Sequence, residues 1–297
     1  MDKWPPVAVV GLGRIGTGIA RSLLRGGSQV CVYNRTVSKA APFLAAGATI
    51  ARTLGEATRG AEIVVTSLLD DGSLRAVVQG EDGLLESMAA DAIHVSTTTC
   101  SPGLSDEISL LHASAGQQFL AAPVLGRPHL AHSGELVSLV GGPLDVLDRA
   151  RLVIEAYSVR IVHVGAPPGT ANSLKLAYNF YLASMAELFG EFLTFTEKSG
   201  VDHEIAMHML RGLQDHHPGV AGYLERIGER SFDDAGFEMA TGLKDLQLLL
   251  AAAVAVRSPL PYGDIVRDRT VSALATGLGE KDWSAFTEIS RLNSGLP

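Results

Sequence analysis

The chain has 297 residues, of which 46% are hydrophobic and 19% are charged, and its formal net charge is −8. The length predicts two domains, the composition provides a large core and excludes a disordered chain, and the acidic balance disfavours nucleic acid and anionic membranes as partners. With two cysteines (Cys31 and Cys100), no signal-peptide pattern in residues 1–6 and no apolar run long enough for a bilayer, a cytoplasmic protein is expected.

A short run of β-branched residues near the start of the chain predicts a first strand, Val7–Val10. It leads directly into Gly11-Leu12-Gly13-Arg14-Ile15-Gly16, and a helical pattern opens at Arg14. Strand, glycine turn and helix in this order are the context of a dinucleotide-binding fingerprint. The glycines permit the turn, the approach of a pyrophosphate and close packing of the helix, whose N-terminus attracts anions. We therefore predict that these six residues bind a dinucleotide.

The end of the second predicted strand, residues 29–33, distinguishes NAD from NADP. An acidic residue about 20 residues after the glycines would bind the ribose 2′-hydroxyl of NAD. Here the strand ends in Asn34, Arg35 and Thr36. A guanidinium pairs with a 2′-phosphate, which a carboxylate would repel. We therefore predict that these three residues select NADP(H).

Strands alternate with helices through the first 164 residues. Alternation of this kind predicts an α/β fold with a doubly wound, mostly parallel sheet, whose ligand lies at the carboxyl ends of the strands. The loop that contains Leu68 and Leu69 follows one such end, and Thr99 follows another. We assign residues 1–164 to an NADP-binding Rossmann domain. Beyond the first two, strands are predicted at 62–66, 91–96, 118–122, 136–140 and 159–164, and helices at 38–46, 102–115 and 143–156.

The character of the sequence changes after residue 164, where a turn-rich segment precedes a helical pattern over residues 170–198. About 29 residues of helix would extend roughly 43 Å. A helix of this length that is apolar on most faces predicts contact with a second chain as well as with its own core. We assign residues 165–297 to a helical domain for substrate binding and dimerisation. Its remaining helices are predicted at 203–212, 220–230, 241–256, 263–275 and 283–292.

Lys175 is the main candidate for chemistry, because it lies one turn inside the long helix among apolar neighbours. Asn179 follows at i+4 and Asn172 precedes at i−3, so the three share one side. Loss of solvation lowers the pKa of such an amine toward the value that a general acid for carbonyl reduction needs. By itself, this spacing is more typical of a lysine that extends to solvent. The adjacent His216 and His217 are poorly spaced for a metal, and no metal site is predicted.

Five segments occur in this chain in the order found in one known family. They are the glycine motif, Tyr33-Asn34-Arg35-Thr36, Thr98-Thr99-Cys100-Ser101-Pro102, residues 169–179 and Lys244-Asp245-Leu246. They resemble the β-hydroxyacid dehydrogenases, which include 3-hydroxyisobutyrate dehydrogenase and the semialdehyde reductases and are related to the imine reductases. The resemblance implies that Thr99 lies beside the nicotinamide and that Lys244 reaches the cofactor. It also implies that Lys175 is the catalytic acid and base, with Asn179 as its partner.

Departures from the family pattern lie in two segments, the predicted substrate segment and the predicted catalytic segment. Where the family has Ser-Gly-Gly to bind a carboxylate, this chain has Leu125, Gly126 and Arg127. Arg127 either anchors the carboxylate through its charge or points to solvent, which would leave a greasier pocket for a ketone or imine. Tyr178 replaces an asparagine, and it either brings a hydroxyl near the reacting centre or only packs against its neighbours. Ala171 replaces a glycine.

The resemblance implies a homodimer in which NADPH reduces a small aldehyde or keto acid, or in which the matching hydroxyacid is oxidised. The substrate would lie between the two domains, and Lys175 would deliver the proton. One alternative is an NADPH-dependent imine reductase, although such relatives usually carry Asp or Tyr at position 175. A second alternative is an NADP-binding regulatory module without catalysis, which would need the glycines and Arg35 but neither Lys175 nor Asn179.

Overall fold

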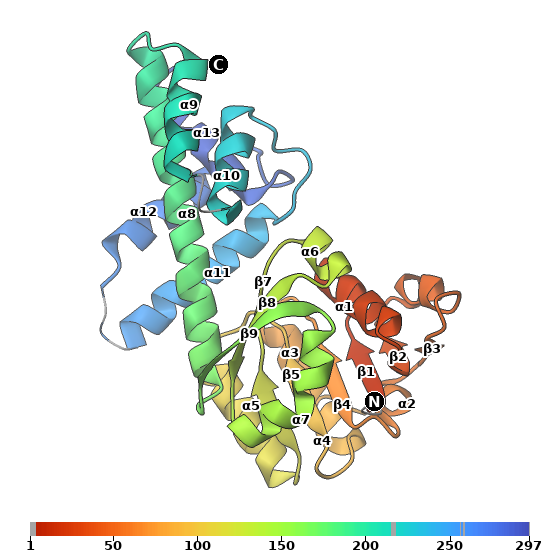
Figure 1. Cartoon of the computed structure of the whole chain (residues 1–297). Helices are drawn as coiled ribbons and strands as arrows, with labels where there is room; N and C mark the ends of the chain where they lie inside the picture. The colour runs from red at the N-terminus through yellow and green to blue at the C-terminus, as the bar shows by residue number, and fades with distance from the viewer. Residues whose placement is uncertain (1–3, 215–217, 256, 258, 297) are drawn as a thin grey trace. The chain divides into compact units, whose positions relative to one another are not determined.

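The computed structural model describes residues 4–214, 218–255, 257 and 259–296, and the chain divides into two compact units (Figure 1). The first unit ends at Lys175 and the second begins at Leu176. The sequence places the boundary after residue 164, whereas the first two turns of the long helix belong to the first unit. None of the described helices is long and apolar enough to cross a membrane.

The described part of the first unit is built on a nine-stranded sheet with the order β3-β2-β1-β4-β5-β6-β8-β7, and β9 pairs with β8. Strands β1 to β6 run parallel, β8 is antiparallel to β6 and β7, and β9 is parallel to β8. The strand order reverses between β1 and β4, which confirms the predicted doubly wound, mostly parallel α/β fold. The strands are β1 (Val7–Val10), β2 (Val30–Tyr33), β3 (Thr49–Ile50), β4 (Ile63–Thr66), β5 (Ile93–Ser96), β6 (Gln118–Ala121), β7 (Val124–Leu125), β8 (Leu136–Gly141) and β9 (Ser158–Gly165).

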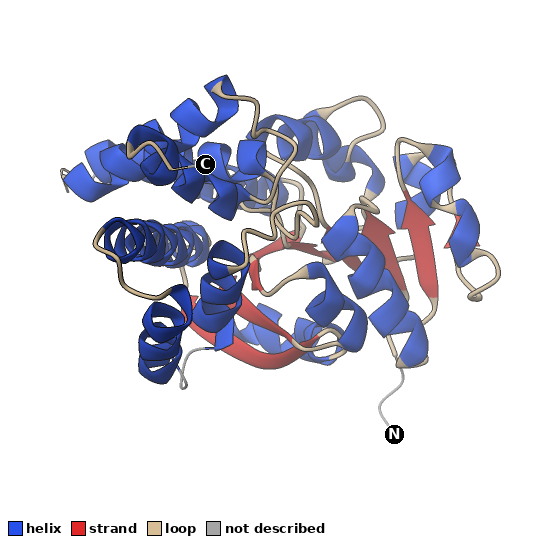
Figure 2. Ribbon diagram, turned by 90° about the horizontal axis from the view of Figure 1, so that it is seen from above, coloured by secondary structure: helices blue, strands red, loops and turns tan. Residues whose placement is uncertain are grey.

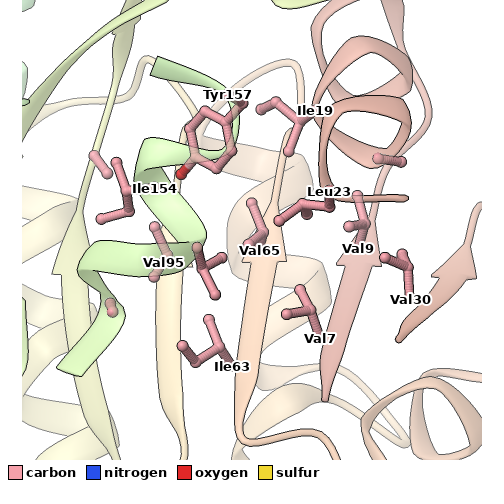
Figure 3. Close-up of a cluster of buried hydrophobic side chains, with 14 of the residues drawn as sticks. Val7, Val9, Ile19, Leu23, Val30, Ile63, Val65, Val95, Ile154 and Tyr157 are labelled. Atoms are coloured by element: carbon pink, nitrogen blue, oxygen red, sulfur yellow. The ribbon is translucent and has the colours of Figure 1, made fainter. Parts of the chain in front are cut away.

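Helices cover both faces of this sheet, as Figure 2 shows. Because side chains alternate along a strand, Val7 and Val9 pack with α1 and α7, whereas Ala8 and Val10 pack with α3 and α5. Figure 3 shows the first of these clusters. Burial on both faces explains why these strands read as continuous apolar runs. The helices are α1 (Arg14–Arg25), α2 (Leu54–Thr58), α3 (Asp71–Gln79), α4 (Leu84–Ser87), α5 (Pro102–Ser114), α6 (Pro128–Ser133) and α7 (Leu144–Glu155).

The predicted helix at 38–46 is wrong. Two short 3-10 turns, Val37–Lys39 and Ala41–Phe43, occupy this stretch, and Pro42 lies in the second of them. Proline lacks the N–H that a continuous helix would need at that position, so the segment breaks there. The sequence analysis also missed strands β3 and β7 and helices α2, α3, α4 and α6. All of these except α3 are too short to show a period.

The second unit is helical in the residues that the structure describes. Its buried core includes Trp283, which is 1% exposed, and Gly242 in α11 lies against the indole. The predicted helix at 283–292 is a 3-10 turn, Trp283–Thr287, followed by a short α-helix. The helices are α8 (Gly169–Lys198), which begins in the first unit, α9 (His203–Gln214), α10 (Pro218–Gly228), α11 (Met239–Ala255), α12 (Pro261–Ala275) and α13 (Glu288–Asn293).

The contact between Gly242 and Trp283 gives a direct test of this core. A Cβ at Gly242 would lie 1.8 Å from the indole Cε3, so Gly242→Ala must displace the ring. We expect a loss of ~1–3 kcal/mol in unfolding free energy, measured by thermal and urea melts. Gly222→Ala in α10 is the matched control, because beyond its own helical turn no described atom lies within 4 Å of its Cβ position, and alanine favours helix. Equal melting temperatures for both variants would contradict the tight packing.

Candidate active site

The glycine turn after β1 is held by close backbone approach. Gly11 has a φ of +95°, and a Cβ there would lie 2.3 Å from the carbonyl oxygen of Ser67. A Cβ at Gly16 would lie 2.0 Å from the carbonyl oxygen of Gly11. The position of Gly13 is different, since no described atom beyond its chain neighbours lies within 4 Å of its Cβ site, and no described side chain caps the first turn of α1. The turn therefore has the shape that a dinucleotide pyrophosphate needs against a helix N-terminus.

Asn34, at the end of β2, supports this turn directly. Its Oδ1 accepts a hydrogen bond of 2.9 Å from the Leu12 amide, and its Nδ2 donates to the Thr36 carbonyl at 3.0 Å. Asn34 thus holds the turn from the neighbouring strand, a role that the sequence did not predict. The next side chain, Arg35, is exposed and forms no ion pair with any described residue. An exposed guanidinium beside the turn could take a 2′-phosphate.

The loops after β4 and β5 are joined to each other at the same edge of the sheet. The Leu68 amide donates to the Thr98 hydroxyl at 3.1 Å, and the Thr97 hydroxyl donates to the Thr66 carbonyl at 2.9 Å. Leu68 and Thr99 are half-buried, whereas Leu69 is largely exposed. The structure therefore brings the predicted cofactor residues of the first unit to the carboxyl ends of four adjacent strands.

The start of α8 is bound to the segment that follows β5. Asn172 is 1% exposed, its Oδ1 accepts from the Cys100 amide at 3.1 Å, and its Nδ2 donates to the Ser105 hydroxyl at 2.8 Å. The Gly169 amide, at the first position of α8, donates to an Asp106 carboxylate oxygen at 2.8 Å. These bonds fix the helical turn that carries Lys175, whose side chain is half-buried.

The predicted substrate segment follows β6. Leu125 ends β7 and packs against the buried cluster that contains Cys100 and Ala171. Gly126 is exposed with a φ of +138°, and Arg127 is half-buried and precedes the first turn of α6. Leu125 thus presents an apolar surface where the family pattern has a hydroxyl.

Helix α6, which follows Arg127, is tied to the cofactor helix α1. The Ser22 hydroxyl of α1 donates to the Ala131 carbonyl at 3.1 Å. A Cβ at Gly18 would lie 2.5 Å from the Ala131 methyl carbon, so the two helices pack at backbone distance. The glycine turn and the predicted substrate segment are therefore anchored to one pair of helices.

In the second unit, a buried carboxylate joins two predicted site residues. Asn179 Nδ2 donates to Asp245 Oδ2 at 2.6 Å, and Lys244 Nζ lies 2.8 Å from Asp245 Oδ1. Asp245 is 3% exposed, which makes it the shared partner of both side chains. The sequence analysis quoted the Lys-Asp-Leu segment for Lys244 and missed Asp245. The available signal was an acidic residue in a mostly apolar helix.

The other residues that the sequence analysis considered are placed as follows. Tyr178 is half-buried on α8, and burial together with the neighbouring Tyr181 raises the pKa of its phenol, so it keeps its proton at neutral pH. His216 and His217 lie outside the described residues. Along α8, Lys175 and Asn179 are separated by one helical turn.

Comparison with family models matches the two parts of the chain separately. Residues 6–165 match the model described as the NAD binding domain of 6-phosphogluconate dehydrogenase. Residues 169–289 match the model described as NAD-binding of NADP-dependent 3-hydroxyisobutyrate dehydrogenase. Together the two models account for most of the chain.

Individual relatives agree with these models. An uncharacterized oxidoreductase of Bacillus subtilis, YfjR, is 39% identical over 94% of this chain and 98% of its own length. The 3-hydroxyisobutyrate dehydrogenase of Mycobacterium tuberculosis, solved with L-serine, is similar with a TM-score of 0.88 and 25% identity over 97% of this chain and all of its own. An imine reductase of Myxococcus stipitatus, solved with NADP+, shares the fold at a TM-score of 0.63 and 23% identity, over 96% of this chain and 99% of its own.

Proposed function

The chain belongs to the family of NAD(P)-dependent hydroxyacid dehydrogenases, and we propose that it is an NADPH-dependent reductase of a small aldehyde or keto acid. In the opposite direction it would oxidise the corresponding β-hydroxyacid. The observation that carries this proposal is the half-buried Lys175 on a helical turn that Asn172 binds to the segment after β5. The proton donor is thereby anchored at the strand edge to which the glycine turn also belongs.

The proposed roles of the side chains follow from their chemistry. When bound, a reduced nicotinamide supplies the hydride for the carbonyl carbon. Lys175 donates a proton from its ammonium group to the carbonyl oxygen, and its neutral amine takes that proton back in the oxidative direction. Asn179 donates to Asp245, which leaves its amide oxygen as an acceptor for the ammonium group of Lys175. Asp245 also pairs with Lys244, so we propose that it positions both side chains.

Removal of the amine at position 175 tests this mechanism. We expect Lys175→Met to lower kcat by ~100-fold or more, because general acid catalysis is lost, while the NADPH dissociation constant stays within about two-fold. NADPH absorbance is followed with a panel of semialdehydes, keto acids, ketones and cyclic imines. Lys198→Met, at the exposed end of the same helix, is the matched control.

The panel also separates the alternatives. Aldehyde turnover that survives Lys175→Met would contradict the proposed mechanism. Turnover of imines alone would favour imine reduction, which the apolar Leu125 surface supports and the lysine at position 175 opposes. Binding of NADPH without turnover of any compound would favour a regulatory module. A preference for anionic substrates that Arg127→Met removes would assign Arg127 as the carboxylate anchor.

We propose NADP(H) as the cofactor because Asn34 stands where an NAD enzyme carries a carboxylate and Arg35 follows it. We expect Arg35→Ala to raise the KM for NADPH about ten-fold or more and to leave the KM for NADH within about two-fold. Arg59→Ala removes another exposed arginine of the first unit and serves as the control. Equal effects of Arg35→Ala on both cofactors would contradict selection through the 2′-phosphate.

We also propose a homodimer that forms through α8. Leu174, Tyr181 and Leu188 follow one another at intervals of seven residues and are 42%, 44% and 48% exposed, and Phe192 continues this stripe at 39%. An exposed apolar stripe with a seven-residue repeat favours packing against another helix, here a second copy.

Charge placed in the stripe tests the dimer. We expect the unmodified chain to have the mass of a dimer in light scattering at micromolar concentration, and Tyr181→Glu with Leu188→Glu to shift it to the monomer mass, because two charges would be buried. Leu110→Glu on α5 is the control, since this leucine is 71% exposed outside the stripe. A double variant that remains dimeric would exclude α8 as the interface.

A further inference from the structure

A hydrogen-bonded series of four buried polar side chains lies inside the first unit. Thr66 Oγ1 and His94 Nε2 lie 2.9 Å apart, and His94 Nδ1 and His112 Nε2 also lie 2.9 Å apart. His112 Nδ1 lies 2.7 Å from Gln117 Oε1. Both histidines are 0% exposed. The proposed catalytic mechanism uses none of these four residues.

The hydrogen bonds of this series of side chains all run in one direction. Gln117 Nε2 donates to the carbonyl oxygens of Leu84, Leu85 and Met88, so Gln117 Oε1 is an acceptor and His112 Nδ1 carries a proton. Burial lowers the pKa of both histidines, and for His94 the neighbouring His112 adds to the effect, so both rings are neutral at pH 7.

Neutral rings complete the assignment. With its proton on Nδ1, His112 accepts at Nε2 from His94 Nδ1, and His94 then accepts at Nε2 from the Thr66 hydroxyl. Each donor in the series therefore has its acceptor, and the last donor is Thr66.

Thr66 is the last residue of β4, and at this residue the series of side chains meets the glycine turn. Its carbonyl accepts from both the amide and the hydroxyl of Thr97, at 2.8 and 2.9 Å. The next residue, Ser67, donates its amide to Val10 and is the residue whose carbonyl oxygen leaves no room for a side chain at Gly11. A small displacement of Thr66 would therefore press Ser67 into the glycine turn or withdraw it.

We propose that His94 and His112 are positioning residues for the dinucleotide site, which act through the Thr66 hydroxyl to hold the end of β4 against the glycine turn. The proposal rests on dinucleotide binding by the first unit and is independent of the substrate and of the preference for NADP. His94 and His112 also fill the core beside Phe119, whose ring centroid lies 5.1 Å from that of His94. The experiment must therefore separate positioning from packing.

Two substitutions at one site make this separation. His94→Phe keeps an aromatic ring beside Phe119 and deletes both hydrogen bonds, whereas His94→Gln keeps polar atoms that can bridge Thr66 and His112. For His94→Phe we expect the dissociation constants of NADPH and of NADH to rise about three- to ten-fold. They are measured by fluorescence titration at pH 7.5. His94→Gln is expected to restore most of the affinity. Exposed His208→Gln is the control.

Hydrogen exchange of the dinucleotide-free protein gives a second measurement that needs no cofactor. The Ser67 and Leu68 amides are bonded to Val10 and Thr98, so a released β4 end exchanges them faster. We expect faster exchange in the peptide around residues 63–70 for His94→Phe, and near wild-type exchange for His94→Gln. If wild type binds no dinucleotide, the proposed function fails, while the exchange result still decides whether His94 holds the end of β4 in place.

Neutrality of the pair has its own check. The side chains that bond to or stack on the two rings are those of Thr66 on β4, Phe119 on β6 and Gln117, and none of these three is charged or titrates near neutral pH. The unfolded chain takes up protons below about pH 6.5 that the folded chain resists, so stability falls as the pH falls below that value. His94→Gln is expected to flatten this fall between about pH 6.5 and 5 in thermal melts.

Wild-type affinity and wild-type exchange for His94→Phe would overturn the proposal. Weaker binding of equal size in His94→Phe and His94→Gln would overturn it as well, because packing alone would then account for the change. If His94→Phe does not fold, Thr66→Val replaces it, since this variant keeps the shape of the side chain and removes the last donor. Thr66→Val is then expected to raise the dissociation constant about three- to ten-fold, and unchanged binding and exchange would reject the positioning role.

Discussion

Three backbone segments meet at the glycine turn with no space for one additional carbon atom. The carbonyl oxygens of Ser67 and Gly11 occupy the places where side chains at Gly11 and Gly16 would begin. This contact sets the distance between the end of β1, the loop after β4 and the first turn of α1. Because Gly13 faces open space instead, the same contact leaves the helix N-terminus accessible.

From the turn outward, side chains fasten each segment of the strand edge to its neighbour. Asn34 holds the turn from β2, Thr98 holds the loop after β4, and Asn172 holds the start of α8. Each of these bonds ends on a backbone amide, so each fixes the course of a loop rather than the tip of one side chain. The position of Lys175 near the start of α8 thus depends on residues that are distant in sequence.

The broad architecture could be predicted from the periodicity of the sequence, whereas features that depend on tertiary contacts could not. Runs of β-branched residues and the long apolar helix are local patterns, so the parallel sheet, its reversal and α8 could be predicted. The break at Pro42 and the shortest strands left no period to detect. The partners of the candidate site residues were also hidden, because no local pattern indicates that Asn34 meets the Leu12 amide or that Asp245 lies between Asn179 and Lys244.

The docking of α6 on α1 has a consequence for attempts to alter specificity. Gly18 and Ala131 pack at backbone distance, and Ser22 and Arg25 hold the carbonyl groups of Ala131 and His132. The position of the loop before α6 therefore depends on the packing of α6 against α1. A transplant of that loop from a relative would have to bring the whole short helix and a complementary surface on α1, because a bulkier residue at either contact would tilt the foreign loop away from its new scaffold.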